Sequence, residues 1–193
     1  MLNVRTAAML TTWRAFAVVL TIAAAGGGYA ALRATQTSQR AHDRPAWIEI
    51  AWPFASDQWG RGRAFRCRAA DCGGEVDLYL RAKIGFCNCA STIDDEEVDR
   101  VTDFDLIGGE HAALDPGRPI DVHGMDGRSR RYALGGHGGK GRSVFAIAFH
   151  DRCDMVIATS VIAGADPATH ENAVIEFLNS EEVRRWAEVT LGL

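Results

Sequence analysis

The chain has 193 residues, of which 47% are hydrophobic, and its formal net charge is −4. This length suits one domain of ordinary size with some residues to spare, and such a domain can bury a core without help from disulfides. Residues 1–40 contain four arginines and no acidic residue, so residues 41–193 hold 17 of the 21 basic and all 25 acidic residues, a net charge of −8. Because nonspecific nucleic-acid binding depends on neutralising phosphates, this charge excludes a nucleic-acid partner.

An uncharged run of 18 residues, AFAVVLTIAAAGGGYAAL, occupies residues 15–32 and follows Arg5 and Arg14. A helix of roughly 17 or more apolar residues can cross a bilayer, so this run is predicted to be a transmembrane anchor behind a cytoplasmic tail at 1–14. The alternative is a signal peptide, with 1–14 as its basic region and 15–32 as its apolar region. Residues 33–46 are predicted to be a polar linker.

Both interpretations place residues 47–193 outside the cytoplasm, as an extracytoplasmic domain. The predicted location is therefore a bacterial-type inner membrane with the domain in the periplasm, or the periplasm itself if the N-terminus is cleaved.

The first predicted elements of this domain are strands. Residues 47–54 alternate in the manner of a strand that Pro53 ends, and residues 60–68 form a second strand. In residues 75–86 apolar positions alternate with polar ones, which is typical of a strand with one face in the core and one in solvent.

Residues 91–105, STIDDEEVDRVTDFD, are predicted to form a helix. Ser91 or Thr92 would cap its N-terminus, and acidic side chains in the first turn are favourable there. The acidic run at 94–105 is predicted to be the solvated face of this helix.

More strands follow this helix. Short strands are predicted at 120–123 and 130–134, with a turn at 125–127 between them. The strongest strand signal is a hairpin of two apolar runs at 143–150 and 153–162, which we expect near the centre of a sheet because both runs are apolar on nearly every position.

Two helices are predicted at the C-terminus. Asp166 and Pro167 are typical of a helix start, and Asn179 and Ser180 interrupt the pattern and cap a second helix. The predicted fold class is therefore α+β: a mostly antiparallel sheet with a mid-chain helix and C-terminal helices packed on it, preceded by a transmembrane or signal helix. This element order is similar to that of the PsbP-like extrinsic domains, and a similarity of order implies nothing about individual residues.

Five cysteines are candidates for disulfides in an oxidising compartment: Cys67, Cys72, Cys87, Cys89 and Cys153. Five cysteines allow 15 arrangements of two disulfides, and the sequence does not choose among them. Cys67 and Cys72 flank a turn that they could close. Cys87 and Cys89 would point to the same face of an extended strand, so Cys153 is a better partner for either than they are for each other.

A metal site is the alternative for the same cysteines. The spacing, Cys-x4-Cys followed after fourteen residues by Cys-x-Cys, is not that of a usual zinc knuckle, although a close thiolate pair suits Cu(I). The residues that would hold Cu or Zn are Cys87, Cys89, His111 and His123.

No catalytic motif is recognisable. The Gly-rich segment 136–141 matches Gly-x-Gly-x-x-Gly but precedes a predicted strand rather than a helix, so it does not predict a dinucleotide site, and no Gly-x-Ser-x-Gly is present. The sequence therefore predicts a membrane-tethered or exported accessory or binding domain without catalytic activity or cofactor. Its expected partners are the inner membrane and a membrane protein. The alternatives are a periplasmic metal-handling protein and an enzyme of a type that the sequence does not reveal.

Overall fold

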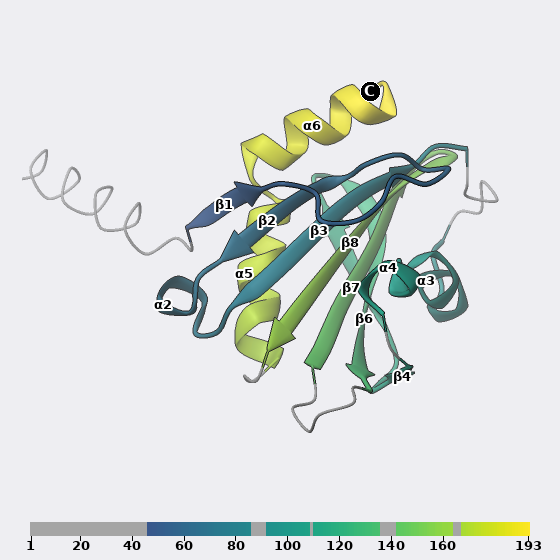
Figure 1. Cartoon of the computed structure of the whole chain (residues 1–193). Helices are drawn as coiled ribbons and strands as arrows, with labels where there is room; N and C mark the ends of the chain where they lie inside the picture. The colour runs from purple at the N-terminus through teal and green to yellow at the C-terminus, as the bar shows by residue number, and fades with distance from the viewer. Residues whose placement is uncertain (1–45, 86–91, 109, 136–141, 164–166) are drawn as a thin grey trace, which may run out of the picture. The chain divides into compact units, whose positions relative to one another are not determined.

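The computed structural model describes residues 46–85, 92–108, 110–135, 142–163 and 167–193, with the backbone alone at 163 and 167–169. These residues form an eight-stranded antiparallel sheet with helices on both faces (Figure 1). The predicted fold class of the domain is confirmed. The predicted tail, the predicted membrane or signal helix and nearly all of the linker lie outside the described residues. Among the helices that are described, none is both long and apolar enough to cross a membrane.

The sheet has the order β1-β2-β3-β8-β7-β6-β4, and β5 also pairs with β6. The hairpin of β7 and β8 lies in the middle of this order, as predicted, because its residues are apolar on both faces. The strands are β1 (Trp47–Ile50), β2 (Arg63–Cys67), β3 (Val76–Lys83), β4 (His111–Ala113), β5 (Arg118–Val122), β6 (Met125–Leu134), β7 (Arg142–Asp151) and β8 (Asp154–Ala163).

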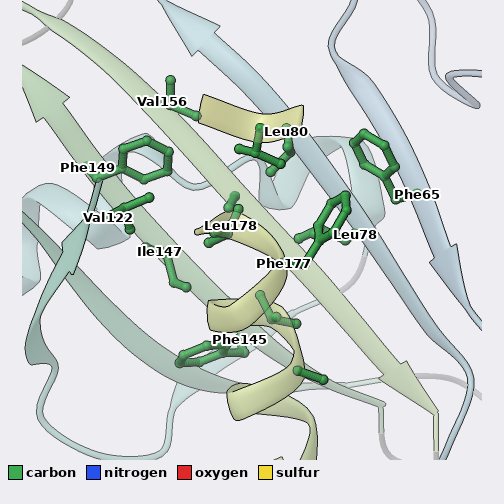
Figure 2. Close-up of a cluster of buried hydrophobic side chains, with 14 of the residues drawn as sticks. Phe65, Leu78, Leu80, Val122, Phe145, Ile147, Phe149, Val156, Phe177 and Leu178 are labelled. Atoms are coloured by element: carbon green, nitrogen blue, oxygen red, sulfur yellow. The ribbon is translucent and has the colours of Figure 1, made fainter. Parts of the chain in front are cut away.

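The helices lie in two groups, one on each face of the sheet (Figure 1). They are α2 (Ala69–Cys72), α3 (Asp95–Val101), α4 (Phe104–Ile107), α5 (Pro167–Leu178) and α6 (Glu181–Leu191). Helices α5 and α6 pack over the larger core, in which Phe177 and Leu178 of α5 meet side chains from β2, β3, β7 and β8 (Figure 2). Helices α3 and α4 cover the other face, where Ala146 and Ala148 of β7 leave room for Val98 and Val101 of α3.

The start of the mid-chain helix differs from its prediction. The side chain of Asp94, rather than that of Ser91 or Thr92, caps α3 by accepting a hydrogen bond of 2.8 Å from the backbone N–H of Glu97. Several consecutive residues here can act as caps, so the sequence alone did not fix the first turn. The second predicted cap, Ser180 at the start of α6, is confirmed, since its hydroxyl accepts from the N–H of Val183.

The turn that joins β5 and β6 lies two residues earlier than predicted. Met125 pairs with Val122, so the turn consists of His123 and Gly124 instead of residues 125–127. Both turn residues have positive φ, 55° and 79°, as a two-residue turn with the twist of a hairpin requires. The β7–β8 turn falls at Arg152 and Cys153, one residue later than the gap between the two predicted strands. Helix α2 and strand β4 are short elements that the sequence did not predict.

Candidate functional site

Two of the cysteines form a disulfide between the end of β2 and helix α2. Cys67 and Cys72 are bonded to each other and are 0% and 4% exposed, so the bond closes the turn from inside the larger core. Cys153 is disulfide-bonded as well. Cys87 and Cys89 lie outside the described residues, and the predictions that depend on them stay predictions.

The two histidines of the predicted metal site lie at opposite ends of β6. His111 pairs with Leu134 at the C-terminal end of this ten-residue strand, and His123 lies in the turn just before its N-terminal end. At the usual rise per residue of a strand, these two ends are about 30 Å apart. They therefore do not share one metal ion. The His111 ring stacks on Phe104 with centroids 3.7 Å apart, and His123 Nε2 donates to the carbonyl of Ser180 at 3.2 Å. Within the described ranges, no three His, Cys, Asp or Glu side chains converge in a way that could hold a metal ion.

Two cations of β3 are buried, although the alternation predicted that this side of the strand would face solvent. Arg81 and Lys83 are 3% and 5% exposed, because α3, α4 and the segment after β1 cover this face. Asp103 accepts hydrogen bonds of 2.9 and 2.6 Å from Arg81 and lies 2.9 Å from Lys83 Nζ, which also donates to the carbonyl of Val101. Asp57 accepts from Arg81 at 2.7 Å.

This buried network fastens three segments together. Burial of the guanidinium opposes the charged form of Arg81, but hydrogen bonds to Asp103 and Asp57 outweigh this effect and raise its pKa. Because every one of these groups is held by a neighbour, the network serves to join β3, the α3–α4 junction and the segment between β1 and β2. Its role is structural.

A second ionic contact ties the first residue of α3 to β6. Asp95 pairs with Arg128 and accepts hydrogen bonds of 3.1 and 3.0 Å from the backbone N–H of Gly117. A Cβ at Gly117 would lie 2.4 Å from an Asp95 oxygen, so only glycine permits this approach. The hydrogen bond from Arg128, aided by the one from Gly117, holds the pKa of Asp95 below its ordinary value of 3.8.

We expect the replacement Asp95→Asn to lower stability at neutral pH and to have no effect in acid. The folded-state pKa is depressed, so the contribution of Asp95 is fully present above its unfolded-state pKa and disappears as the pH falls through the lower folded-state value. Urea denaturation of both proteins between about pH 7 and pH 2 measures this, and the difference in stability should begin to shrink below about pH 4. A difference that persists unchanged into acid would contradict it.

A concave groove lies between the start of α3 and the β5–β6 hairpin. We call it the acidic groove. Its volume is about 630 Å³. Its lining residues are Thr92, Ile93, Asp94, Pro119, Ile120, Asp121, Asp126, Gly127 and Arg128.

The three carboxylates of the acidic groove are exposed. Asp94 accepts a hydrogen bond from the N–H of Glu97, and Asp121 accepts one from the N–H of Gly124. None of the ion pairs among the described residues includes Asp94, Asp121 or Asp126. Arg128 is the cation among the lining residues, and it pairs with Asp95 and donates to the carbonyl of Gly117 instead. The groove is therefore negatively charged.

A second hollow of about 640 Å³ lies beside α4 and is lined by Phe104, Asp105, Gly108, Glu110 and His111. It contains two more exposed carboxylates, those of Asp105 and Glu110, and the stacked ring of His111. The α3–α4 side of the sheet thus carries two open, acidic depressions.

No protein-family model matches this chain, and no curated protein matches it. Among solved structures the chain is similar to PA94, a protein of unknown function from Pseudomonas aeruginosa, with 14% identity, a TM-score of 0.40, and 70% of this chain and 81% of that one covered. It is also similar to the cyanobacterial PsbP of Synechocystis sp. PCC 6803, with 14% identity, a TM-score of 0.43, and coverage of 68% and 78%. Likeness at this level carries no argument about activity or partners.

Sequence reasoning missed the acidic groove because its walls come from distant segments. Residues 92–94 lie about 30 positions before the hairpin residues that complete it. The acidic run at 94–105 was a signal in the right region, but the interpretation as a solvated face was only partly correct. Asp95, Asp99 and Asp103 pair with arginines of β6 and β3, whereas Asp94 and Asp105 are exposed in the two hollows.

Proposed function

We propose that this chain is a non-catalytic accessory domain that is exported across, or tethered to, a bacterial-type inner membrane and binds a protein partner there. The observation that carries the proposal is the contrast between its two kinds of ionisable group. The buried ones, such as Arg81 and Asp103, are locked in structural ion pairs, whereas the carboxylates of the acidic groove are exposed and unneutralised. A wide, open, charged groove suits the binding of a partner.

Export is supported by two independent features. The uncharged run at 15–32 follows two arginines and precedes a polar segment, as in an anchor or signal peptide. The buried disulfide of Cys67 and Cys72 suits an oxidising compartment, where such bonds persist.

Binding is favoured over catalysis by the state of the ionisable groups. A general acid or base works best when burial or a neighbouring charge shifts its pKa toward neutrality inside a cleft. In the acidic groove the ionisable groups are exposed carboxylates and an arginine in an ion pair, a set that attracts a cationic surface.

Site-specific photocrosslinking in intact cells tests this proposal. A photoreactive residue replaces Thr92, which is exposed at the rim of the acidic groove, and in a control variant it replaces Arg185 on the opposite side of the sheet, whose side chain is 74% exposed. We expect one discrete adduct with a membrane-associated protein from position 92 and none from position 185.

Protease added to spheroplasts tests the location in the same cells. We expect it to digest the domain without lysis of the inner membrane, and Cys67 and Cys72 should resist alkylation until they are reduced. A domain that is protected from protease, with alkylatable cysteines, would contradict export. The absence of an adduct from position 92 would contradict partner binding.

A further inference from the structure

We infer that the acidic groove binds a short basic segment of the partner, in which lysine or arginine side chains alternate with apolar ones. This inference rests on the proposed function and deepens it by specifying the chemistry of the partner. Three features of the groove support it: its floor, its rim and an opposed pair of charges in the hairpin.

The floor of the acidic groove is apolar. Ile93, which is half-buried, and the exposed Pro119 line it, whereas the half-buried Ile120 at its edge also packs against the larger core on the other face of the sheet. Ile93 and Pro119 gain from being covered, so the floor favours a ligand that carries apolar side chains.

The rim of the groove is acidic. Asp94, Asp121 and Asp126 are exposed, and no cation of the described residues forms an ion pair with any of them. Each carboxylate can accept several hydrogen bonds, and the backbone N–H groups that contact Asp94 and Asp121 use only one each. Their remaining acceptors suit ammonium or guanidinium groups.

Two of these carboxylates oppose each other across the hairpin. Asp121 of β5 and Asp126 of β6 are direct cross-strand partners, and like charges in this position destabilise a sheet. The two carboxylates therefore repel each other, and an asparagine in place of either Asp121 or Asp126 would remove this repulsion. A basic ligand between the strands and α3 would convert that repulsion into attraction, which is a reason for both aspartates to be present.

The arrangement suits a peptide better than a single metal ion. In the part of the chain that the structure describes, the acidic side chains do not converge on one point as metal ligands do, but are spread around a groove of about 630 Å³. Spaced carboxylates around an apolar floor match several positive charges separated by apolar side chains. The net charge of −8 in residues 41–193 disfavours nucleic acid at the same surface.

Fluorescence anisotropy with the full-length protein tests the inference. The probe is a labelled peptide of alternating lysine and valine, Lys-Val-Lys-Val-Lys, compared with Lys-Gly-Lys-Gly-Lys. The groove variant combines Asp94→Asn, Asp121→Asn and Asp126→Asn, because asparagine keeps the oxygen that caps α3 and the hairpin turn. The matched control changes the same number of charges on α6, with Glu181→Gln, Glu182→Gln and Glu188→Gln.

We expect the groove variant to bind the valine peptide at least tenfold more weakly than the wild type, and the α6 control to change its affinity less than twofold. The glycine peptide should bind the wild type at least threefold more weakly than the valine peptide. Equal weakening by both triple variants would show general charge attraction and overturn the inference, as would the absence of binding or equal affinity for the two peptides.

A stability measurement shows that lost binding does not come from unfolding. We expect Asp126→Asn alone to raise the urea midpoint while it weakens peptide binding, because it removes the cross-strand repulsion. A lowered midpoint would overturn the argument from opposed charges.

An adduct at Thr92 without peptide binding would leave partner binding standing and reject the basic segment. Peptide binding without any adduct in cells would instead reject the proposed function.

Discussion

Replacement of Phe177 by alanine is expected to lower the free energy of unfolding by about 4 kcal/mol, the usual range for a buried phenylalanine being about 3–5 kcal/mol. Phe177 is 8% exposed and lies between Trp47 and Phe65, with ring centroids 4.9 and 4.8 Å away. Its ring joins α5 to β1 and β2, so the alanine variant loses both the buried area and two aromatic contacts. Urea denaturation of the full-length protein, followed by tryptophan fluorescence, measures the loss.

Two controls make this result specific to the ring. Phe177→Leu keeps most of the volume and should lower stability by only about 1–2 kcal/mol. Val189→Ala on α6, where the valine is 79% exposed, should change stability by less than about 0.5 kcal/mol. If Phe177→Ala were as mild as Val189→Ala, α5 would not be held to β1 and β2 through this ring.

Replacement of Asp103 by asparagine is expected to lower stability by about 3 kcal/mol. The variant keeps the shape of the side chain but leaves Arg81 and Lys83 buried without their shared carboxylate. A buried charge that loses its partner retains the penalty of desolvation, and this penalty is larger than the net worth of the original pair. Thermal and urea unfolding of the two proteins at neutral pH provide the comparison.

The neighbouring carboxylate is the matched control. Asp57 also pairs with Arg81, but its side chain is 38% exposed, so Asp57→Asn should lower stability by less than about 1 kcal/mol. A triple variant with Arg81→Met, Lys83→Met and Asp103→Leu should regain most of the stability that Asp103→Asn loses, because an apolar set needs no charge partner. If the triple variant were as unstable as Asp103→Asn, the charged groups would contribute to stability beyond neutralising one another.

Much of the fold was predictable because it depends on local patterns. The β7–β8 hairpin follows from two apolar runs with a short turn between them, and Ser180 recaps the chain where the helical pattern breaks. The start of α3 was not predictable in the same way, because Ser91, Thr92 and Asp94 are all residue types that can cap a helix, and the pattern alone does not choose Asp94.

The site was less predictable because it depends on which surfaces meet. The alternation in β3 identified Leu78 and Leu80 as core residues, yet it could not show that α3 and α4 would bury Arg81 and Lys83 on the other face. The histidines appeared close in the sequence, but the length of β6 separates them. The acidic groove depends on the packing of α3 beside a hairpin about 30 residues away.

The pairing of β3 with β8 has a consequence for how the chain is made. Leu80 pairs with Ala158, so about 80 residues must be synthesised after one strand before its neighbour exists. At about 5–20 residues per second, β3 waits roughly 4–16 s with an open edge. Meanwhile β6, β7 and β8 are each completed shortly after the strand before them and can assemble as they emerge. The N-terminal strands are therefore the part of the nascent chain most exposed to aggregation, and a slow final docking step onto β8 should limit the folding rate.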